Sequence, residues 1–192
     1  MQTFFLATNN KHKIKEVLEI APDIEWKTIA DFPELDGFDP EETGKTFIEN
    51  AEIKARAYAA KTGLITVAED SGLEVASLNN EPGIYSARWS PGSDTDRNIA
   101  LLDRMKNEKN REARYVATIC VFDPQTDKTE FFIGKVNGVI SQEIKGDKGF
   151  GYDPLFIPNG YDKTFGQLGS EIKQKLSHRK NAFTKFLSWV KN

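Results

Sequence analysis

Short apolar runs alternate along the chain with segments of helical periodicity. Gln2 to Ala7 is an apolar run rich in Phe and Leu, and it predicts a strand. Thr8-Asn9-Asn10 then supplies helix-capping side chains ahead of the charged pattern Lys11 to Ile20, which predicts a helix. Apolar positions from Thr43 to Thr62 suit a long second helix, and Gly63 is a suitable stop signal.

The middle of the chain changes from helical to strand patterning. Leu64 to Ala68 predicts a buried strand whose end delivers Glu69-Asp70-Ser71-Gly72 into a turn. Asp94 to Asn107 predicts a further helix. Two strong strand patterns follow, Ala113 to Phe122 and Lys128 to Asn137. The turn-prone residues between these two runs indicate that they pair as a hairpin.

The last third of the chain is punctuated by glycine and ends in a helix. Gly146 to Pro158 carries no clear periodicity, and a terminal helix is expected from about Ser177. The apolar stripe of this helix consists of Phe183, Phe186, Leu187 and Val190. Strands near both ends, helices between them and a hairpin predict an α/β fold with a mixed central sheet flanked by helices. Residues 1–192 suit one large domain or a single two-lobed unit.

Composition and charge limit the classes of partner that this protein is expected to bind. The formal net charge is −3, from 26 basic and 29 acidic residues, which argues against a sequence-tolerant grip on polymeric nucleic acid. No stretch approaches the ~20 apolar residues that span a bilayer, and the N-terminal apolar run is too short for a signal peptide, so we expect a cytosolic protein without a membrane partner. The one cysteine, Cys120, cannot form an internal disulfide and is expected to be a buried small hydrophobe.

Three polar clusters come from distant parts of the chain. In the first, Thr8, Asn9, Asn10 and Lys13 follow a strand at a helix start, where backbone amides, polar side chains and a lysine can hold phosphate oxygens. An ordinary helix cap is the alternative for this segment. The Gly-rich pattern of a P-loop is absent from the sequence.

The second cluster is acidic. Glu41-Glu42 precedes the long helix, and Glu69-Asp70 follows an apolar strand. Hard oxygen ligands favour Mg²⁺, which typically takes one or two carboxylates while substrate phosphates and waters complete its shell. A solvated acidic surface is the alternative for Glu41-Glu42, whereas Asp70 is placed to present its carboxylate at an edge of the sheet.

The third cluster lies in the C-terminal part, at Gly149 to Pro154, Lys173 and Ser177-His178-Arg179. Glycines on both sides of Phe150 permit an exposed ring with the backbone close by, which suits stacking on a flat base. Phe150 or Tyr152 can equally belong to the core, and the His-Arg pair can be plain surface. Arg and Lys here would suit purine oxygens.

These segments, in this order from end to end, resemble the inosine triphosphate pyrophosphatase family, also called the Ham1-like or non-standard purine NTP pyrophosphatases. The resemblance rests on Ala7 to Lys13 with its T-x-N-x-x-K pattern, Glu41-Glu42-Thr43-Gly44, Thr46 to Ala51, Glu69 to Leu73, Pro82 to Trp89, Gly149 to Pro154 and Ser177-His178-Arg179. It implies a mixed α/β fold with two lobes around an active-site cleft, a homodimer, and cleavage between the α- and β-phosphates of ITP, XTP and their deoxy forms.

The resemblance also implies residue roles. Asp70 matches the family's essential acidic residue, which would help to bind Mg²⁺ and would activate or orient the attacking water, with Glu42 as second carboxylate. The implied substrate-binding residues are Thr8, Asn9, Asn10, Lys13, Lys54 and Ser71 toward the phosphates, and Phe150, Gly151, Tyr152, Asp153, Lys173, His178 and Arg179 toward the nucleoside and base. Glu69 stands where the family more often has Asp, and we expect no direct ligand role for it.

Two other functions fit parts of the same pattern. A related pyrophosphatase acting on a modified pyrimidine, dTTP or UTP would use the same phosphate and metal residues, and only the region of Phe150 and His178-Arg179 argues against it. A non-catalytic module that senses purines is the second alternative. Retention of both Asp70 and Glu42 argues against that module, because a pure binder gains little from keeping metal and water geometry.

Overall fold

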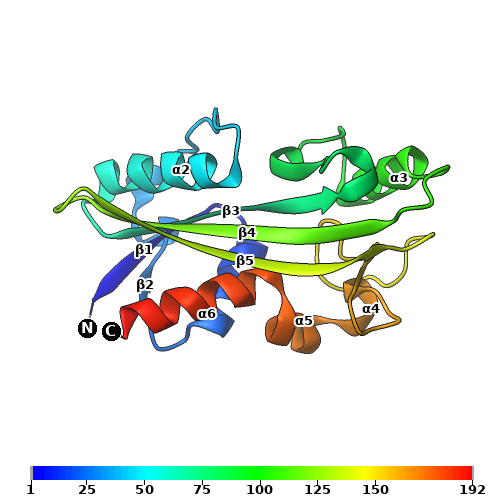
Figure 1. Ribbon diagram of the computed structural model, residues 1–192. Helices are drawn as coiled ribbons and strands as arrows, with labels where there is room; N and C mark the ends of the chain where they lie inside the picture. Colours follow the sequence, from blue (N-terminus) through cyan, green and yellow to red (C-terminus); the bar gives the residue numbers. More distant parts are fainter. Residues whose placement is uncertain (1, 192) are drawn as a thin grey trace. The chain divides into compact units, whose positions relative to one another are not determined.

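The computed structural model describes residues 2–191 and contains a six-stranded sheet and six α-helices in that range (Figure 1). The strands are β1 Thr3–Ala7, β2 Glu25–Lys27, β3 Thr66–Val75, β4 Glu112–Asp123, β5 Lys128–Ile140 and β6 Phe156–Pro158. The helices are α1 Lys11–Ile20, α2 Phe47–Thr62, α3 Asp94–Arg104, α4 Phe165–Leu168, α5 Ser170–Leu176 and α6 His178–Val190.

The sheet is mixed, as predicted. Its strand order is β2-β1-β3-β4-β5-β6, and neighbouring strands are hydrogen-bonded. β1 runs parallel to both β2 and β3, whereas β6 runs antiparallel to β5. The predicted pairing of the two long strands is confirmed by the adjacency of β4 and β5. The short elements β2, β6, α4 and α5 were not predicted, because three to seven residues carry too little periodicity to stand out.

The chain folds into two compact units. Of the described residues, unit 1 contains 2–70, 117–134 and 181–191, and unit 2 contains 71–116 and 135–180. Strands β3, β4 and β5 and helix α6 each contribute residues to both units. The prediction of a single domain with two lobes around a cleft stays a prediction.

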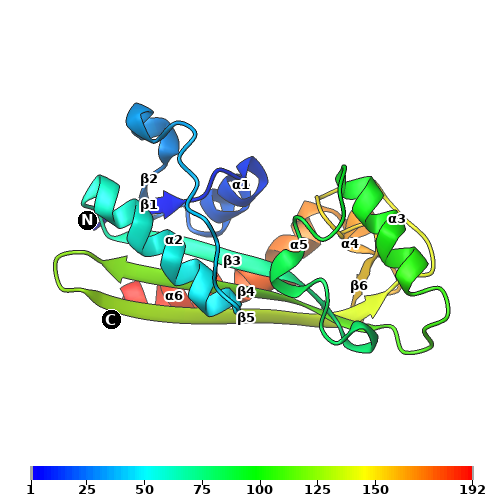
Figure 2. The same ribbon diagram turned by 90° about the horizontal axis from the view of Figure 1, so that it is seen from above.

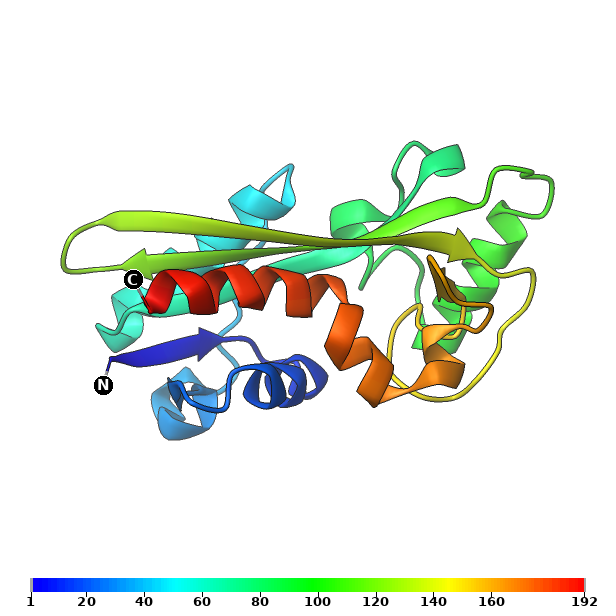
Figure 3. The same ribbon diagram turned by 60° about the horizontal axis from the view of Figure 1, so that its bottom comes forward.

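Unit 1 has a core on each face of its strands. Side chains alternate along β1, so Phe4 and Leu6 pack in one cluster while Phe5 and Ala7 pack in the other. The first cluster includes the α6 side chains Phe183 and Phe186, as the predicted apolar stripe requires, and the second includes Ala51, Ala55 and Tyr58 of α2. Figures 1 and 3 show α2 and α6 on opposite faces of the sheet, with α6 lying along the strands.

Unit 2 has one core. It is formed by side chains of β3, α3, β4 and the segment around β6, including Leu73, Leu101, Tyr115 and Phe156. Ring contacts tie the centre together, since Tyr115 and Phe156 have centroids 4.8 Å apart. Figure 2 shows α3 beside the loop that precedes β6. This arrangement places the glycine-punctuated segment directly against a helix.

The prediction that Glu69-Asp70-Ser71-Gly72 forms a turn was wrong. β3 continues through these residues to Val75. The pairing of β1 with β3 ends at Ala7 and Ala68, so β1 leaves β3 just before the carboxylates while β4 continues on the other side. Gly72 is needed for close packing and not for a turn, because a Cβ there would lie 2.2 Å from the carbonyl oxygen of Gly83.

The predicted helices lie close to their expected positions. α1 spans Lys11–Ile20 as expected, and Asn10 caps it. α2 begins at Phe47 after the cap Thr46 and ends at Thr62, and the C-cap Gly63 has a left-handed φ of 68°. Among residues 2–191 no helix is long and apolar enough to cross a membrane.

Cys120 is fully buried in the cluster beneath α2, and burial raises the pKa of its thiol to about 12. We therefore expect the native protein to resist thiol reagents at pH 8, where the thiolate fraction is roughly 10⁻⁴ of the total. A chromogenic disulfide reagent should modify one thiol rapidly in concentrated guanidinium chloride and almost none in buffer. Rapid modification of the folded protein would contradict this burial.

Candidate functional site

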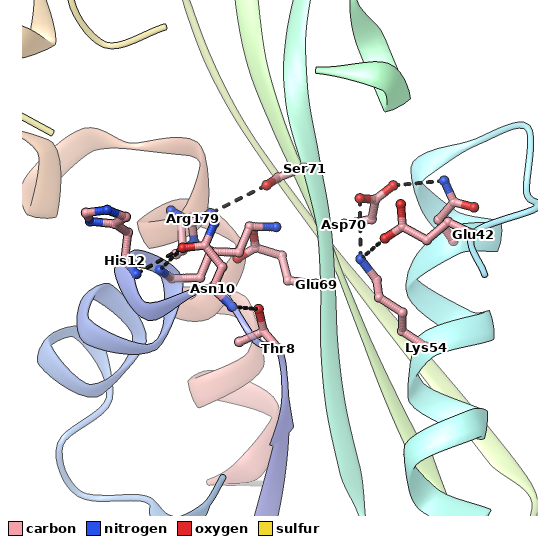
Figure 4. Close-up of polar contacts among 11 residues, drawn as sticks. Thr8, Asn10, His12, Glu42, Lys54, Glu69, Asp70, Ser71 and Arg179 are labelled. Carbon is pink, nitrogen blue, oxygen red and sulfur yellow. Dashed lines mark hydrogen bonds and ion pairs between the residues drawn. The ribbon is translucent and has the colours of Figure 1, made fainter. Parts of the chain in front are cut away.

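A buried carboxylate in the middle of β3 is the centre of the acidic cluster, the second of the three predicted clusters, and this cluster lies within unit 1. Asp70 is 5% exposed and points toward α2 (Figure 4). The ammonium of Lys54 lies 3.5 Å from Asp70 Oδ1 and 2.5 Å from Glu42 Oε1. The predicted trio Glu42, Lys54 and Asp70 is therefore brought together by an ammonium that contacts both carboxylates.

Asn50 connects the two segments that carry these acids. Its Nδ2 donates to Asp70 Oδ2 at 3.2 Å, and its Oδ1 accepts from the backbone N–H of Gly44 at 2.9 Å. A Cβ at Gly44 would lie 2.6 Å from Asn50 Oδ1, so only glycine allows this approach. The loop that contains Glu42 is thereby held at a fixed place beside Asp70.

Burial and charge act against each other in this cluster. Desolvation raises the pKa of the Asp70 carboxyl above its ordinary value, and the charges of Lys54 and Lys13 only partly offset it. Burial also opposes the charge on Lys54, but the carboxylates of Asp70 and Glu42 outweigh that effect and raise the pKa of Lys54. The ammonium therefore stays charged at neutral pH.

The acidic pair suits a hard cation. Within residues 2–191, no group of three or more His, Cys, Asp or Glu side chains is gathered as a ready metal cage. Two carboxylates that converge on one ammonium still match the requirement of Mg²⁺, which takes one or two carboxylates and completes its shell with phosphate and water oxygens. The donor set of Glu42 and Asp70 thus fits such an ion.

The opposite face of β3 holds a second ion pair of unit 1. Glu69 points away from Asp70, as strand alternation requires, and Lys13 Nζ lies 3.4 Å from Glu69 Oε1 (Figure 4). This pairing explains why Glu69 is not part of the Asp70 cluster. Lys13 stands in the first turn of α1, and the helix start brings it to β3 as soon as β1 ends.

The remaining residues of the first predicted cluster shape the start of α1. Asn10 Oδ1 accepts from the backbone N–H groups of His12 and Lys13, and Thr8 Oγ1 accepts from the N–H of Asn10. The amide of Asn9 instead donates to Phe38 O and to the hydroxyl of Tyr58, both at 3.2 Å. Asn10 is therefore a helix cap, and Asn9 holds the loop against α2.

A buried ion pair beside an aromatic ring forms the core of the polar cluster in unit 2. Lys173 Nζ lies 2.6 Å from Asp153 Oδ2, and that carboxylate also accepts the backbone N–H of Phe150. The ring of Phe150 is half-buried, with Lys173 Nζ 4.2 Å and the guanidinium carbon of Arg179 5.8 Å from its centroid. Two cations thus lie next to one flat ring.

Side chains within β3 and at the start of α6 complete this cluster. Arg179 is 1% exposed, and its Nη2 donates to Ser71 Oγ at 3.4 Å. His178 stacks on Tyr115, with ring centroids 4.7 Å apart and planes 11° from parallel. Tyr152 is buried in the unit 2 core, where its hydroxyl donates to Ser86 O and burial raises its pKa to about 12.

The whole chain matches known proteins. The model of the Ham1 family matches residues 4–189. The chain belongs to the Ham1 family. A relative from Staphylococcus aureus (strain Mu50), named dITP/XTP pyrophosphatase, is 42% identical over 100% of both chains. A second with the same name, from Acholeplasma laidlawii, is 42% identical over 94% of this chain and 90% of its own.

Solved structures of Ham1 proteins share the fold of this Ham1-family chain. The Staphylococcus aureus Ham1 protein is 40% identical, with a TM-score of 0.89 over 99% of this chain and 98% of that one. A HAM1 protein from Coxiella burnetii is 34% identical, with a TM-score of 0.90 over 100% and 99%. The predicted family and α/β fold are thereby confirmed.

Sequence reasoning missed several polar residues that support these clusters. Asn50 and Asn98 occupy positions on the core faces of α2 and α3, where helical spacing calls for apolar side chains. A polar residue at such a position must find a hydrogen-bond partner, and this was the signal available in the sequence. Tyr115, which lies against His178, carried no signal because an aromatic residue is ordinary in a buried strand.

Replacing Asp70 with Asn should stabilise the fold in a pH-dependent manner in metal-free buffer. Because the folded pKa of Asp70 is raised above 3.8, ionisation favours the unfolded chain, and the penalty grows as pH rises from that value through the folded pKa. We expect Asp70→Asn to unfold at higher denaturant than the parent at pH 7, with a smaller difference at pH 4. The exposed Asp103→Asn should show no such trend, and a stability loss at pH 7 would contradict the expectation.

Proposed function

We propose that this Ham1-family chain hydrolyses deaminated purine nucleoside triphosphates, namely ITP, dITP, XTP and dXTP, to the monophosphate and pyrophosphate. The observation that carries the proposal is the buried Asp70, held next to Glu42, Lys54 and Asn50. A buried carboxylate whose pKa is perturbed by desolvation and by neighbouring charges is typical of a reacting centre. The names of the relatives from Staphylococcus aureus and Acholeplasma laidlawii support the same reaction and substrate class.

Asp70 and Glu42 would hold Mg²⁺ in this proposal. The bound ion would polarise the phosphate oxygens and neutralise charge that develops at the α-phosphorus. Asp70 also orients the attacking water and accepts its proton as the new bond to phosphorus forms and pyrophosphate leaves. Lys54 contacts both acids. When a metal ion binds the two carboxylates, the ammonium of Lys54 would bind a phosphate oxygen of the substrate instead.

The start of α1 is the proposed support for the triphosphate. Thr8, Asn10 and Lys13 lie there, and the N-terminus of a ten-residue helix favours anions through its backbone amides and dipole. Lys13 already balances Glu69, so a phosphate would compete with that carboxylate for the ammonium. Ser71 follows Asp70 on the same strand and is the last of the residues proposed to bind phosphate.

Phe150 is the proposed stacking platform for the purine. The ammonium of Lys173 and the guanidinium of Arg179 lie next to its ring, so a stacked base meets hydrogen-bond donors at its edge. Hypoxanthine and xanthine present an oxygen acceptor at position 6, whereas adenine presents an amino donor there, which cannot accept a hydrogen bond from those groups. Such a mismatch can reduce kcat/KM by about 10⁴-fold.

Three further properties follow from the family resemblance and belong to the proposal. We infer that the protein is a homodimer and that it is cytosolic. We also infer that Gly151, Tyr152, Asp153 and His178 support the nucleoside site. Asp153 acts through its ion pair with Lys173 and its bond to the Phe150 backbone. His178 acts through its stack on Tyr115.

The first test is pyrophosphate release across ITP, dITP, XTP, ATP, GTP, CTP and UTP, each with Mg²⁺ and each with EDTA. We expect fast, metal-dependent turnover of the first three and at least ~10³-fold lower kcat/KM for ATP. Asp70→Asn should abolish turnover. Near-native turnover by that variant would remove Asp70 from the mechanism.

The same panel separates the alternatives. Preference for CTP or UTP would keep the acidic and phosphate clusters but overturn the role of Phe150 and Arg179 in purine selection. Binding of ITP without release of pyrophosphate under any metal condition would favour a purine-sensing module.

Phe150→Ala should weaken nucleotide binding far more than pyrophosphate binding, because stacking is worth about 1–3 kcal/mol per base. We expect the Kd for IMP, measured by calorimetry, to rise by roughly tenfold or more while the inhibition constant of pyrophosphate stays within about twofold. Phe131→Ala, a replacement at another part-exposed aromatic, is the control. Equal losses for both ligands would contradict a stacking role.

A further inference from the structure

Two side chains of α3 hold both backbone polar groups of Gly151, the residue next to Phe150. Asp94 Oδ2 accepts the Gly151 N–H at 2.7 Å, and Asn98 Nδ2 donates to the Gly151 carbonyl oxygen at 2.9 Å. Asp94 and Asn98 are four residues apart, so they lie on the same face of the helix. Neither residue belongs to the clusters that the sequence indicated.

Asn98 is an unusual residue for its position. It is 2% exposed and stands on the buried face of α3, three residues before Leu101 and seven before Met105, which both pack in the unit 2 core. Its Oδ1 is buried and accepts no hydrogen bond from any described residue. A buried acceptor without a partner destabilises a fold by about 1–3 kcal/mol, so folding stability alone does not explain an asparagine at this position.

The same loop is fixed from its other side. Asp153 accepts the Phe150 N–H at 2.9 Å, and its own N–H donates to the Phe150 carbonyl oxygen at 3.2 Å. Gly149 has a φ of 79°, and a Cβ there would lie 2.1 Å from Asp153 Oδ2. The backbone on both sides of the Phe150 ring is thus hydrogen-bonded to side chains that are themselves anchored, Asp153 by Lys173 and Asp94 by Arg97.

We propose that Asn98 and Asp94 are positioning residues for nucleoside binding, which hold Gly151 so that the Phe150 ring is preorganised for the base. The inference rests on the proposed function, because it takes Phe150 as the stacking platform. Neither residue is assigned a contact with substrate. Their effect comes from fixing the backbone, since a ring that must be ordered on binding loses affinity to the entropy of ordering.

This role explains why a destabilising asparagine occupies a core position. Asparagine can donate to the Gly151 carbonyl, whereas leucine has a similar branched shape but no donor. Residues that serve function at the expense of stability are common in sites that must be held rigid. The geometry therefore predicts that one substitution lowers nucleotide affinity while changing the stability of the fold little.

The decisive variant is Asn98→Leu, with ITP turnover, IMP binding and thermal unfolding as readouts. We expect a nearly unchanged Tm, because the variant removes one unsatisfied acceptor and leaves another at the Gly151 carbonyl. The KM for ITP and the Kd for IMP should rise by about tenfold, with kcat and the inhibition constant of pyrophosphate within about twofold of the parent. A structural residue without a positioning role would lower Tm and leave KM alone. An unchanged KM in a folded variant overturns the proposal.

A second pair of variants tests the same role at exposed positions, where a substitution does not disturb the packing of the core. Asp94→Ala and Asp96→Ala each remove an acid from the exposed first turn of α3, but only Asp94 contacts Gly151, whereas Asp96 closes the capping box with Ser93. We expect similar losses of Tm and a raised KM for ITP in Asp94→Ala alone. A KM raised equally in both variants would assign the effect to helix stability and overturn the proposal.

Phe150→Ala, assayed alongside, separates this inference from the proposed function. Loss of IMP affinity in Phe150→Ala with none in Asn98→Leu or Asp94→Ala overturns the positioning role and leaves the stacking role intact. If Phe150→Ala binds IMP as the parent does, both roles fail. If the parent protein turns over none of the deaminated purine nucleotides, the proposed function fails first.

Discussion

A carboxylate buried in the middle of a strand is the constraint around which unit 1 is organised. Water cannot stabilise the charge of Asp70, so the protein must supply a cation and hydrogen-bond donors from its own side chains. Lys54 and Asn50 do so from consecutive turns of α2. Their backbone positions require α2 to pack with this face on β3, and the small residues Ala51 and Ala55 make that close approach feasible.

The side chains that stabilise the buried charge of Asp70 also fix the position of neighbouring parts of the chain. Lys54 reaches Glu42 with the same ammonium, and Asn50 holds the Gly44 N–H, so the loop before α2 takes its position from the same two side chains. Glycine at position 44 is required because the Asn50 amide occupies the space of a Cβ. A network satisfied in this way is rigid, because each hydrogen bond and ion pair holds its partners at fixed places.

Much of the fold was predictable because its long elements have strong periodicity. The α1 helix, with its Asn10 cap, and the two strands of the hairpin were located from local patterns alone. The turn expected at Glu69 to Gly72 failed for a physical reason: Gly72 and the acids resemble a turn locally, whereas the strand continues through pairing with β4. Local sequence cannot show that a distant segment, Gly83 to Ser86, packs on a glycine.

The sequence allowed the charged groups of the candidate site to be predicted, but not the residues that hold those groups in place. Asp70, Lys173 and Arg179 drew attention as charges in suggestive segments, but their partners come from elements far along the chain. Asn50 and Asn98 share one feature that a sequence does display, an amide on the apolar face of an amphipathic helix. Each amide bonds a residue that carries, or lies next to, a proposed functional group. Because a buried amide is tolerated only where its hydrogen bonds are used, interruptions of an apolar stripe are a physical guide to the second layer of a site.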